Sequence, residues 1–202
     1  IVFLAISTFH FGRGDATSSV VGRGAVESIA RGGVVIGGIS QFHRTEANDV
    51  FLTIVGADTT GVWLFLDVLV VFAVACIVET LLFKQQHERT AFGLEIGALS
   101  LLFMAVPPLV GFAVYFCFVH SFRHFSSMRS VLQSTVSSLR ITQTTVVFSL
   151  LTWAFGLVVL AQQSASIGVE PALLKVVFIG LAALTVPHML LVDGVLNQRR
   201  SQ

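Results

Sequence analysis

Histidines within or beside apolar segments are the side chains of this sequence best suited to chemistry. Four of them, His10, His43, His120 and His124, come from three stretches that lie far apart in the chain. The apolar pattern places all four at a similar depth near one face of a membrane, and His188 about five residues deeper at a rise of about 1.5 Å per residue. Ionisable groups at such depth are costly, so each is a functional candidate.

The spacing of two of these histidines points to a metal ion. His120 and His124 stand four residues apart, so both imidazoles project from one side of a helix and can reach one ion. Ligands from separate helices can complete such a site in the core of a helix bundle. Imidazole ligation suits iron, zinc, copper or nickel, so the ligand type does not choose the metal. The convergence of three distant segments favours a metal site.

A structural interpretation competes with the metal site. A histidine in an apolar helix commonly makes a hydrogen bond to a neighbouring helix, and a single HxxxH pair is a weak signal. His87 lies in the charged connector 84–91, where we expect it to be solvated. Acidic side chains could orient the imidazole N–H groups or could pair with arginines instead; they are Asp15, Asp67, Glu79, Glu95 and Asp193.

Aromatic residues gather around the histidines in the sequence, and the chain has 18 phenylalanines in all. They favour a smooth apolar slot for a long hydrophobic or polyene substrate, although lipid-facing and interhelical packing explains any one of them equally simply. The residues are Phe9, Phe11, Phe42, Tyr115, Phe116, Phe118, Phe122 and Phe125.

The elements that position these side chains must be membrane helices. Of the 202 residues, 54% are apolar and 11% charged, with a mean hydropathy of +0.87. Soluble domains carry about 25% charged residues, so lipid must cover much of this chain. A net charge of +1 with no basic cluster excludes nucleic acid as a partner. The two cysteines, both in apolar stretches, exclude a disulfide framework or a cysteine zinc site.

The apolar runs predict an all-α, polytopic membrane bundle with about five to six spans and a single transmembrane domain over residues 1–202. The spans are an N-terminal segment and residues 62–83, 92–120, 141–161 and 173–196. Pro107-Pro108 predicts a kink or break within residues 92–120. The apolar opening without an initiator Met suggests the second half of a helix, in a protein truncated at its N-terminus.

Residues 33–55 alternate between apolar and polar stretches, which favours a re-entrant or interfacial hairpin over a plain span. The positive-inside rule supports this reading and places the C-terminal arginines and the connector 121–140 inside. On this topology Arg13, Arg23, Arg31, Arg123, Arg129, Arg140, Arg199 and Arg200 lie inside. Lys84 and Arg89 fall on the outer side and are discordant.

Four ordered motifs resemble the Brp/Blh family of β-carotene 15,15′-dioxygenases. They are STFHFGRGD at residues 7–15, ARGG at 30–33 leading to Phe42-His43, PPL at 107–109 with YF at 115–116 and HSFRH at 120–124, and TVPHM at 185–189. Together they cover essentially the whole chain and are specific as a set.

The resemblance implies a multi-pass enzyme of the plasma membrane that uses Fe(II) and O2 to cleave β-carotene centrally into two all-trans-retinal molecules. The family's iron ligands carry over to His10, His43, His120 and His124, which are also the catalytic residues. His188 and Asp15 are expected to bind the iron as well or to hold its ligands in place, and Tyr115 is expected to orient substrate or product. The retinal typically serves a microbial rhodopsin. The apolar wall would exclude water and place the central double bond.

Alternatives from other classes remain open. A b-type haem protein would use facing histidines such as residues 10, 120 and 188. A non-catalytic carotenoid or lipid-binding membrane protein would use its histidines only to join helices. A di-iron desaturase is rejected, because it needs about eight histidines in repeated boxes and this chain has six. A retinal-binding opsin is disfavoured, because Lys175 stands near the start of the last apolar segment.

Overall fold

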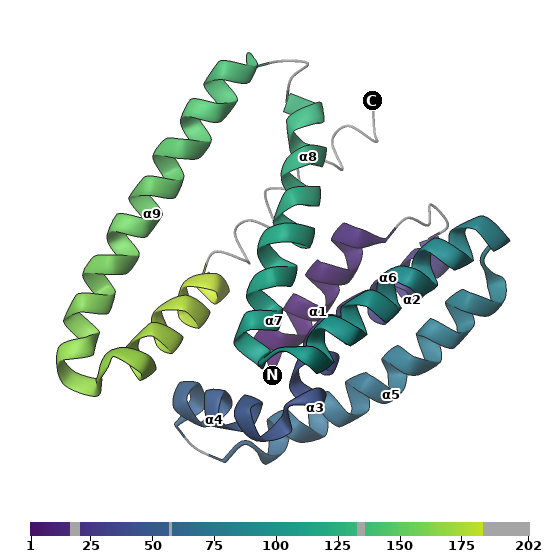
Figure 1. Ribbon diagram of the computed structural model, residues 1–202, viewed down its shortest axis with the longest axis horizontal. Helices are drawn as coiled ribbons and strands as arrows, with labels where there is room; N and C mark the ends of the chain where they lie inside the picture. The colour runs from purple at the N-terminus through teal and green to yellow at the C-terminus, as the bar shows by residue number, and fades with distance from the viewer. Residues whose placement is uncertain (17–20, 57, 133–135, 184–202) are drawn as a thin grey trace. The chain divides into compact units, whose positions relative to one another are not determined.

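The structure is a computed structural model that describes residues 1–16, 21–56, 58–132 and 136–183 (Figure 1). These parts of the chain are helical and contain no β-strand, which confirms the all-α prediction. The chain divides into two compact units, Ile1–Ser127 and Met128–Gln202, and each is described by itself. One domain over residues 1–202 stays a prediction.

The first unit is built from helices joined by short connections. They are α1 (Val2–Asp15), α2 (Val21–Gly33), the π-helix η1 (Val34–Gly38), α3 (Ile39–Phe42), α4 (Arg44–Val55), α5 (Thr60–Phe83), α6 (Gln86–Ala105), α7 (Pro108–Val114), the π-helix η2 (Tyr115–His120) and the first part of α8 (Ser121–Leu132). The boundary between the two units falls within α8, after Ser127. The core of the first unit is centred on large buried side chains, among them Leu66, Phe92, Phe103 and Tyr115.

Glycines bring α1 and α2 into backbone contact. A Cβ placed on Gly12 would lie 1.8 Å from the carbonyl oxygen of Ser28, and one on Gly32 would lie 1.8 Å from the carbonyl oxygen of Thr8. Only glycine leaves room for such an approach, so the small residues of this region are packing contacts. Gly33 and Gly37 bring the same helix close to Ala73 and Val70 of α5.

The hairpin expected over residues 33–55 takes another form. Residues 33–42 continue the helix that begins at Val21, through η1 and α3, and the backbone breaks only at His43. Residues 34–37 are buried, because this mainly β-branched apolar stretch packs against α1, α5 and α6. A polar helix, α4, follows the break and ends at Gly56, whose φ of +68° suits glycine.

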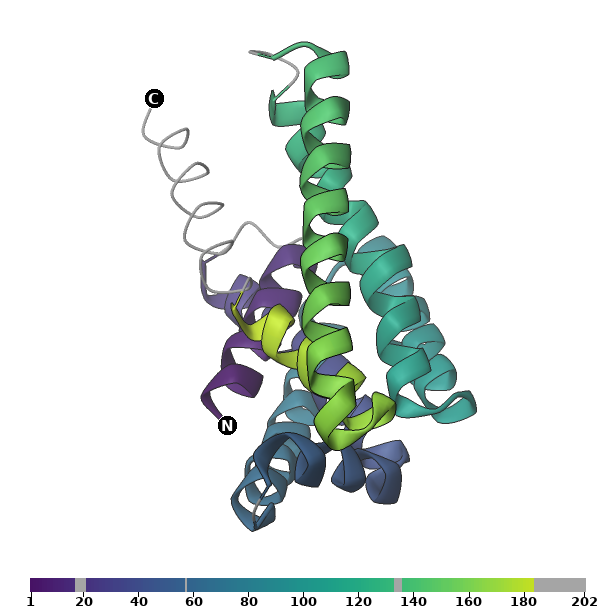
Figure 2. The ribbon, with the colours of Figure 1, turned by 90° about the vertical axis from the view of Figure 1, so that its left-hand side faces the viewer.

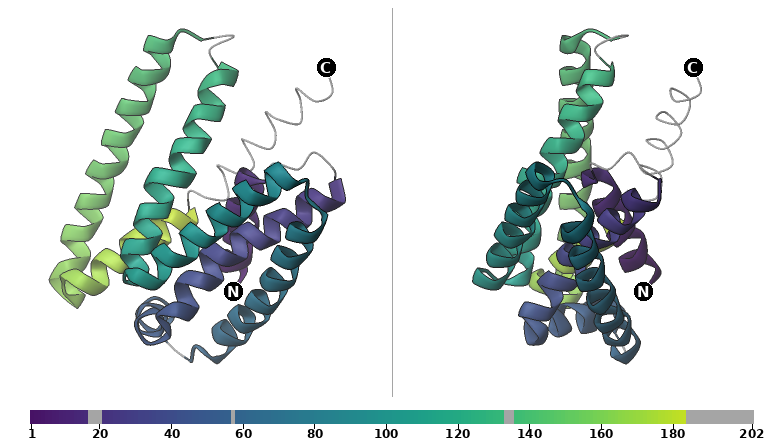
Figure 3. Two further views of the ribbon diagram at one scale, coloured as in Figure 1. Left: turned by 45° about the vertical axis from the view of Figure 1, so that its right-hand side comes forward. Right: turned by 90° about the vertical axis from the view of Figure 1, so that its right-hand side faces the viewer.

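The segment 92–120 is two helices instead of one span, and the expected break falls at Pro107-Pro108. Since a proline nitrogen has no hydrogen to donate, the two prolines end α6 and start α7. The chain turns back there, and Arg123 of α8 reaches Glu95 of α6, 28 residues earlier. Figure 3 shows α5 and α6 joined by a short turn, with α7 and α8 leaving the far end of α6. Residues 121–132, expected in a connector, continue the helix.

The second unit contains α9 (Ser138–Ile167), which covers the expected span 141–161 and runs without a break (Figure 2). Gly168, with φ of +87°, ends it, and residues 169–183 form a further helix. The rest of the expected span 173–196, with His188, lies outside the described residues. Among the described helices, α5 and α9 are the two that are long and apolar enough to cross a membrane.

Candidate active site around His10 and His120

Two of the four predicted ligands face each other across a helix interface. His10 lies on α1, and His120 is the last residue of η2, which packs against α1. Their ring centroids are 5.0 Å apart, and the rings meet edge to face at 68°. His120 is 5% exposed, so this contact is inside the helix bundle. The structure therefore joins residues that are far apart in sequence.

The spacing of this pair fits a shared metal ion. Metal–nitrogen bonds of about 2.1 Å put each imidazole centroid roughly 3.2 Å from an ion, so two rings bound at about 90–110° lie roughly 4.5–5.2 Å apart. The separation of 5.0 Å between His10 and His120 falls in that range. His124 stacks on His120 with centroids 6.2 Å apart and an interplanar angle of 9°. That centroid distance is near the upper limit for two imidazoles that bind one ion, so the His124 side chain has to rotate to reach an ion shared by His10 and His120.

His43 stands at the break between α3 and α4. The preceding α3 packs against α6 and α7, near the Pro107-Pro108 turn, whereas His120 lies at the other end of η2. The Nε2 atom of His43 is buried and has no hydrogen-bond partner among the described residues. A buried imidazole nitrogen without a hydrogen-bond partner is suited to bind a metal ion. Within the described parts of the chain, however, no group of three or more His, Cys, Asp or Glu side chains is close enough to hold a metal. His43 as a ligand therefore stays a prediction.

Aromatic rings enclose His120. Phe11 meets it edge to face at 4.7 Å, and Phe116 stacks on it at 5.9 Å. Tyr115 is fully buried and lies 6.2 Å from His120, between centroids. Of the eight predicted aromatic residues, Phe11, Tyr115 and Phe116 thus line the site. The others are exposed instead: Phe9, Phe42, Phe118, Phe122 and Phe125.

Phe112 is a site residue that the sequence reasoning missed. Its ring stacks on Phe116 at 5.7 Å and meets Phe11 at 6.1 Å. The signal was available, because Phe112, Phe116 and His120 are each four residues apart and so share one helix face. The π-helical turn η2 carries two of the three, and such turns occur frequently at functional sites.

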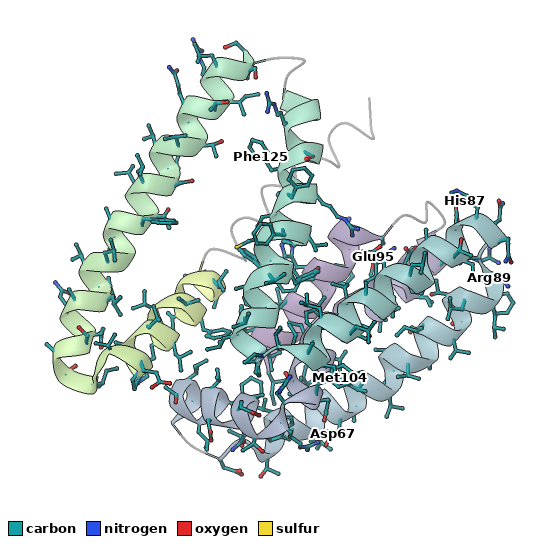
Figure 4. All side chains as sticks on the ribbon, in the orientation of Figure 1. Asp67, His87, Arg89, Glu95, Met104 and Phe125 are labelled. Carbon is teal, nitrogen blue, oxygen red and sulfur yellow. The ribbon has the colours of Figure 1, made fainter. Side chains whose placement is uncertain are left out.

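Of the five acidic residues considered as imidazole partners, Asp67 and Glu95 pair with arginines instead, and Asp193 lies outside the described residues. Asp67 of α5 accepts hydrogen bonds from both terminal nitrogens of Arg44, at 3.0 and 3.2 Å, and from Gln41 at 2.6 Å. Glu95 of α6 accepts one from Arg123 at 2.6 Å and makes an ion pair with Arg31 at 2.7 Å. Figure 4 shows Glu95 on α6 between Arg89 and Met104. The roles predicted for Asp15 and Tyr115 stay predictions.

Arg31 corrects the predicted charge distribution. The positive-inside rule placed Arg31 at the inner side of the membrane, outside the spans, but it lies inside α2, is 5% exposed, and donates a hydrogen bond through Nε to Glu27 at 2.9 Å. The i,i+4 spacing of Glu27 and Arg31 is the sequence signal for this pair.

Comparison with known proteins identifies the family. The family model for β-carotene 15,15′-dioxygenase matches residues 1–195. This chain belongs to the β-carotene 15,15′-dioxygenase family. A β-carotene 15,15′-dioxygenase of the uncultured marine bacterium 66A03 is 34% identical over 207 residues, which cover 100% of this chain and 74% of that protein. No solved structure was found that matches the chain. The family confirms the resemblance drawn from the histidine motifs and disfavours the cytochrome and carrier alternatives.

Proposed function

We propose that this chain cleaves β-carotene with O2 at the central double bond and releases two molecules of all-trans-retinal. One C=C bond is broken, and each of its two carbons becomes an aldehyde carbon with one oxygen atom of O2. The observation that carries the proposal is the family match over residues 1–195. The contact between His10 and His120 supports the proposal, because it places imidazole nitrogens that can bind a metal beside aromatic rings that suit an apolar substrate.

Fe(II) is the cofactor that we propose, with His10, His43, His120 and His124 as its ligands. The spacing of His10 and His120 supports a shared ion, and the buried Nε2 of His43 brings a nitrogen suited to a ligand. Bound iron supplies the activation of O2 that carbon and protein side chains lack. Neutral imidazoles leave the full positive charge on the ion. We propose His188 and Asp15 as further residues around this set.

The protein's own contribution is placement of the substrate and exclusion of water. Phe11, Phe112 and Phe116 form a continuous apolar wall against His120. Flat aromatic faces suit a conjugated polyene, and excluding water from the site prevents side reactions during the oxidation. Tyr115, fully buried beside this wall, brings a hydroxyl group that we propose orients substrate or product.

We propose that the chain is a multi-pass protein of the plasma membrane. The support is strongest for α9. No residue in its most apolar stretch of 18 residues is buried within the structure, so lipid has to cover that stretch. In the most apolar stretch of α5, also 18 residues long, only 17% of the residues are buried. A membrane also explains how the enzyme meets β-carotene, which dissolves in lipid. We propose that the product passes to a microbial rhodopsin.

We propose that the helix over residues 21–42 crosses the membrane and that the segment 92–120 crosses it twice, because these two changes place Lys84 and Arg89 on the inner side, in agreement with the positive-inside rule. In this proposal the five spans expected from the sequence become seven, and the chain returns to one end of the first unit after α1, α5 and α8. Cations gather at that end, which the positive-inside rule makes cytoplasmic. They are Arg13, Arg23, Lys84, Arg89 and Arg123. Figure 4 shows His87 and Arg89 at the opposite end of the α5–α6 pair from Asp67.

Expression of the full chain in bacteria that accumulate β-carotene tests the activity. We expect loss of colour and two retinal molecules per carotene consumed, both abolished by His120→Ala. His87→Ala is the matched control, because His87 is an exposed residue at the start of α6 and should leave retinal formation unchanged. Retinal formation that persists when residues 10, 43, 120 and 124 are all alanine would refute the proposed site.

A further inference from the structure

A row of alternating charges crosses the first unit and ends beside the histidines. The Nζ atom of Lys84 lies 3.1 Å from Oε2 of Glu27, whose Oε1 lies 2.9 Å from Nε of Arg31. A terminal nitrogen of Arg31 lies 2.7 Å from Oε2 of Glu95, and Oε1 of Glu95 lies 2.6 Å from Arg123. Four helix segments are joined in this way: the end of α5, then α2, α6 and α8.

The inner members of this row are deeply buried. The side chains of Glu27 and Arg31 are 1% and 6% exposed, and the ring of Phe92 lies 5.1 Å from the guanidinium carbon of Arg31. Burying charges is costly, and a hydrophobic replacement of the same volume is often as stable. The row is therefore poorly explained by stability alone. Buried ionic groups can instead specify one arrangement of helices, since removing one partner leaves a charge uncompensated.

The row connects α2, which packs against the helix of His10, to α8, which directly continues the helix of His120. His10 lies on α1, which is in backbone contact with α2 through Gly12 and Gly32. On α2, Arg31 holds one oxygen of Glu95, while the other oxygen holds Arg123. Arg123 lies on α8 between His120 and His124.

We propose that Glu95 is a positioning residue, whose two carboxylate oxygens set the register of α8 against α2 and so place His120 and His124 opposite His10. The inference rests on the proposed function, because it assigns the row a role in assembling the proposed iron site. Glu95 does not touch the histidines and acts through Arg123. A neutral amide cannot replace it, because its nitrogen would point a donor at one of the two guanidinium groups.

Two substitutions separate this role from general stability. Glu95→Gln removes the central charge of the row. Arg123→Met removes only the outermost cation, whose side chain is 42% exposed, so this variant should fold even if the first does not. Arg129→Met on the same helix is the matched control, because Arg129 is exposed and donates to Ser138. Arg123→Lys keeps the positive charge and should restore part of the effect.

The measurement is iron bound per purified chain as Fe(II) is raised, together with kcat and KM for β-carotene. Residues that orient metal ligands typically change metal affinity or activity about 10–100-fold. We expect Glu95→Gln and Arg123→Met to need at least about tenfold more Fe(II) for half occupancy, with KM for β-carotene little changed. Added Fe(II) should recover kcat in these variants. Arg129→Met should bind iron as the unmutated chain does.

Equal iron affinity in Arg123→Met and the unmutated chain would overturn the positioning role. So would a loss of activity that added Fe(II) does not recover. If the proposed function itself is wrong, the unmutated chain reveals it, because that chain then cleaves β-carotene without iron or does not cleave it at all.

Discussion

Replacing Gly12 by alanine should separate α1 from α2 and disturb the site on α1. The new Cβ would lie 1.8 Å from the carbonyl oxygen of Ser28 and 2.5 Å from its carbonyl carbon. A carbon–oxygen contact normally needs about 3.3 Å, so the two backbones must move apart by roughly 1.5 Å. Both contact atoms belong to backbone, which cannot rotate away. We expect a destabilisation of about 1–3 kcal/mol.

The same change should affect activity, because Gly12 lies two residues after His10. A displacement of about 1 Å at a reacting group can lower the rate by about 10²-fold, and we expect a loss of retinal formation of that order. The assays are thermal unfolding of the purified protein, followed by circular dichroism, and retinal formed in β-carotene-accumulating cells.

Gly97→Ala is the matched control. Gly97 lies within α6, and a Cβ there would have no atom within 4 Å. Because alanine forms helix better than glycine, this variant should be more stable by about 0.5–1 kcal/mol and equally active. The two substitutions are chemically identical, so opposite signs can come only from their surroundings. Unchanged unfolding and activity in Gly12→Ala would refute the close approach of α1 and α2.

Three further outcomes follow. Hydrogen bonds from the hydroxyl and then the amide of Thr60 lower the pKa of Asp58 below its ordinary value of 3.8. The stabilising effect of this carboxylate at the start of α5 is therefore present above pH 3.8 and lost as the pH falls through the lowered pKa, and Asp58→Ala should abolish this part of the acid dependence of unfolding. In a Trp63→Phe background, brominated lipid should quench Trp153, which is 74% exposed on α9, whereas unquenched fluorescence would contradict a lipid-facing α9. Tyr115→Ala should cost about 3–5 kcal/mol, measured by thermal unfolding, because the fully buried ring leaves a cavity.

The histidine motifs show how far sequence reasoning reached into the site. Hydropathy and spacing selected His10, His120 and His124, and the structure brings these three into one row of ring contacts. The same reasoning placed His43 at a similar depth, but equal depth does not make two residues neighbours. Which helices are adjacent depends on side-chain packing, and α3 packs against α6 and α7 instead.

The main helices could be predicted from properties of residues close together in the sequence. Apolar composition predicted an all-helical fold and the apolar segments that became α5 and α9, and Pro107-Pro108 predicted the break that follows α6. These features depend on hydrogen bonding within a few residues and on the length needed to cross lipid, so the chain order alone specifies them.

Tertiary packing decided the features that join distant residues. The turn at Pro107 sends α8 back along α6, so that Arg123 meets Glu95 and the predicted single span becomes two helices. Glycine contacts with α1 and α5 bury residues 34–37 as part of one helix, and Arg31 becomes an interior charge held by two carboxylates. An unpaired arginine in that place would be unstable, and only the folded arrangement supplies its partners.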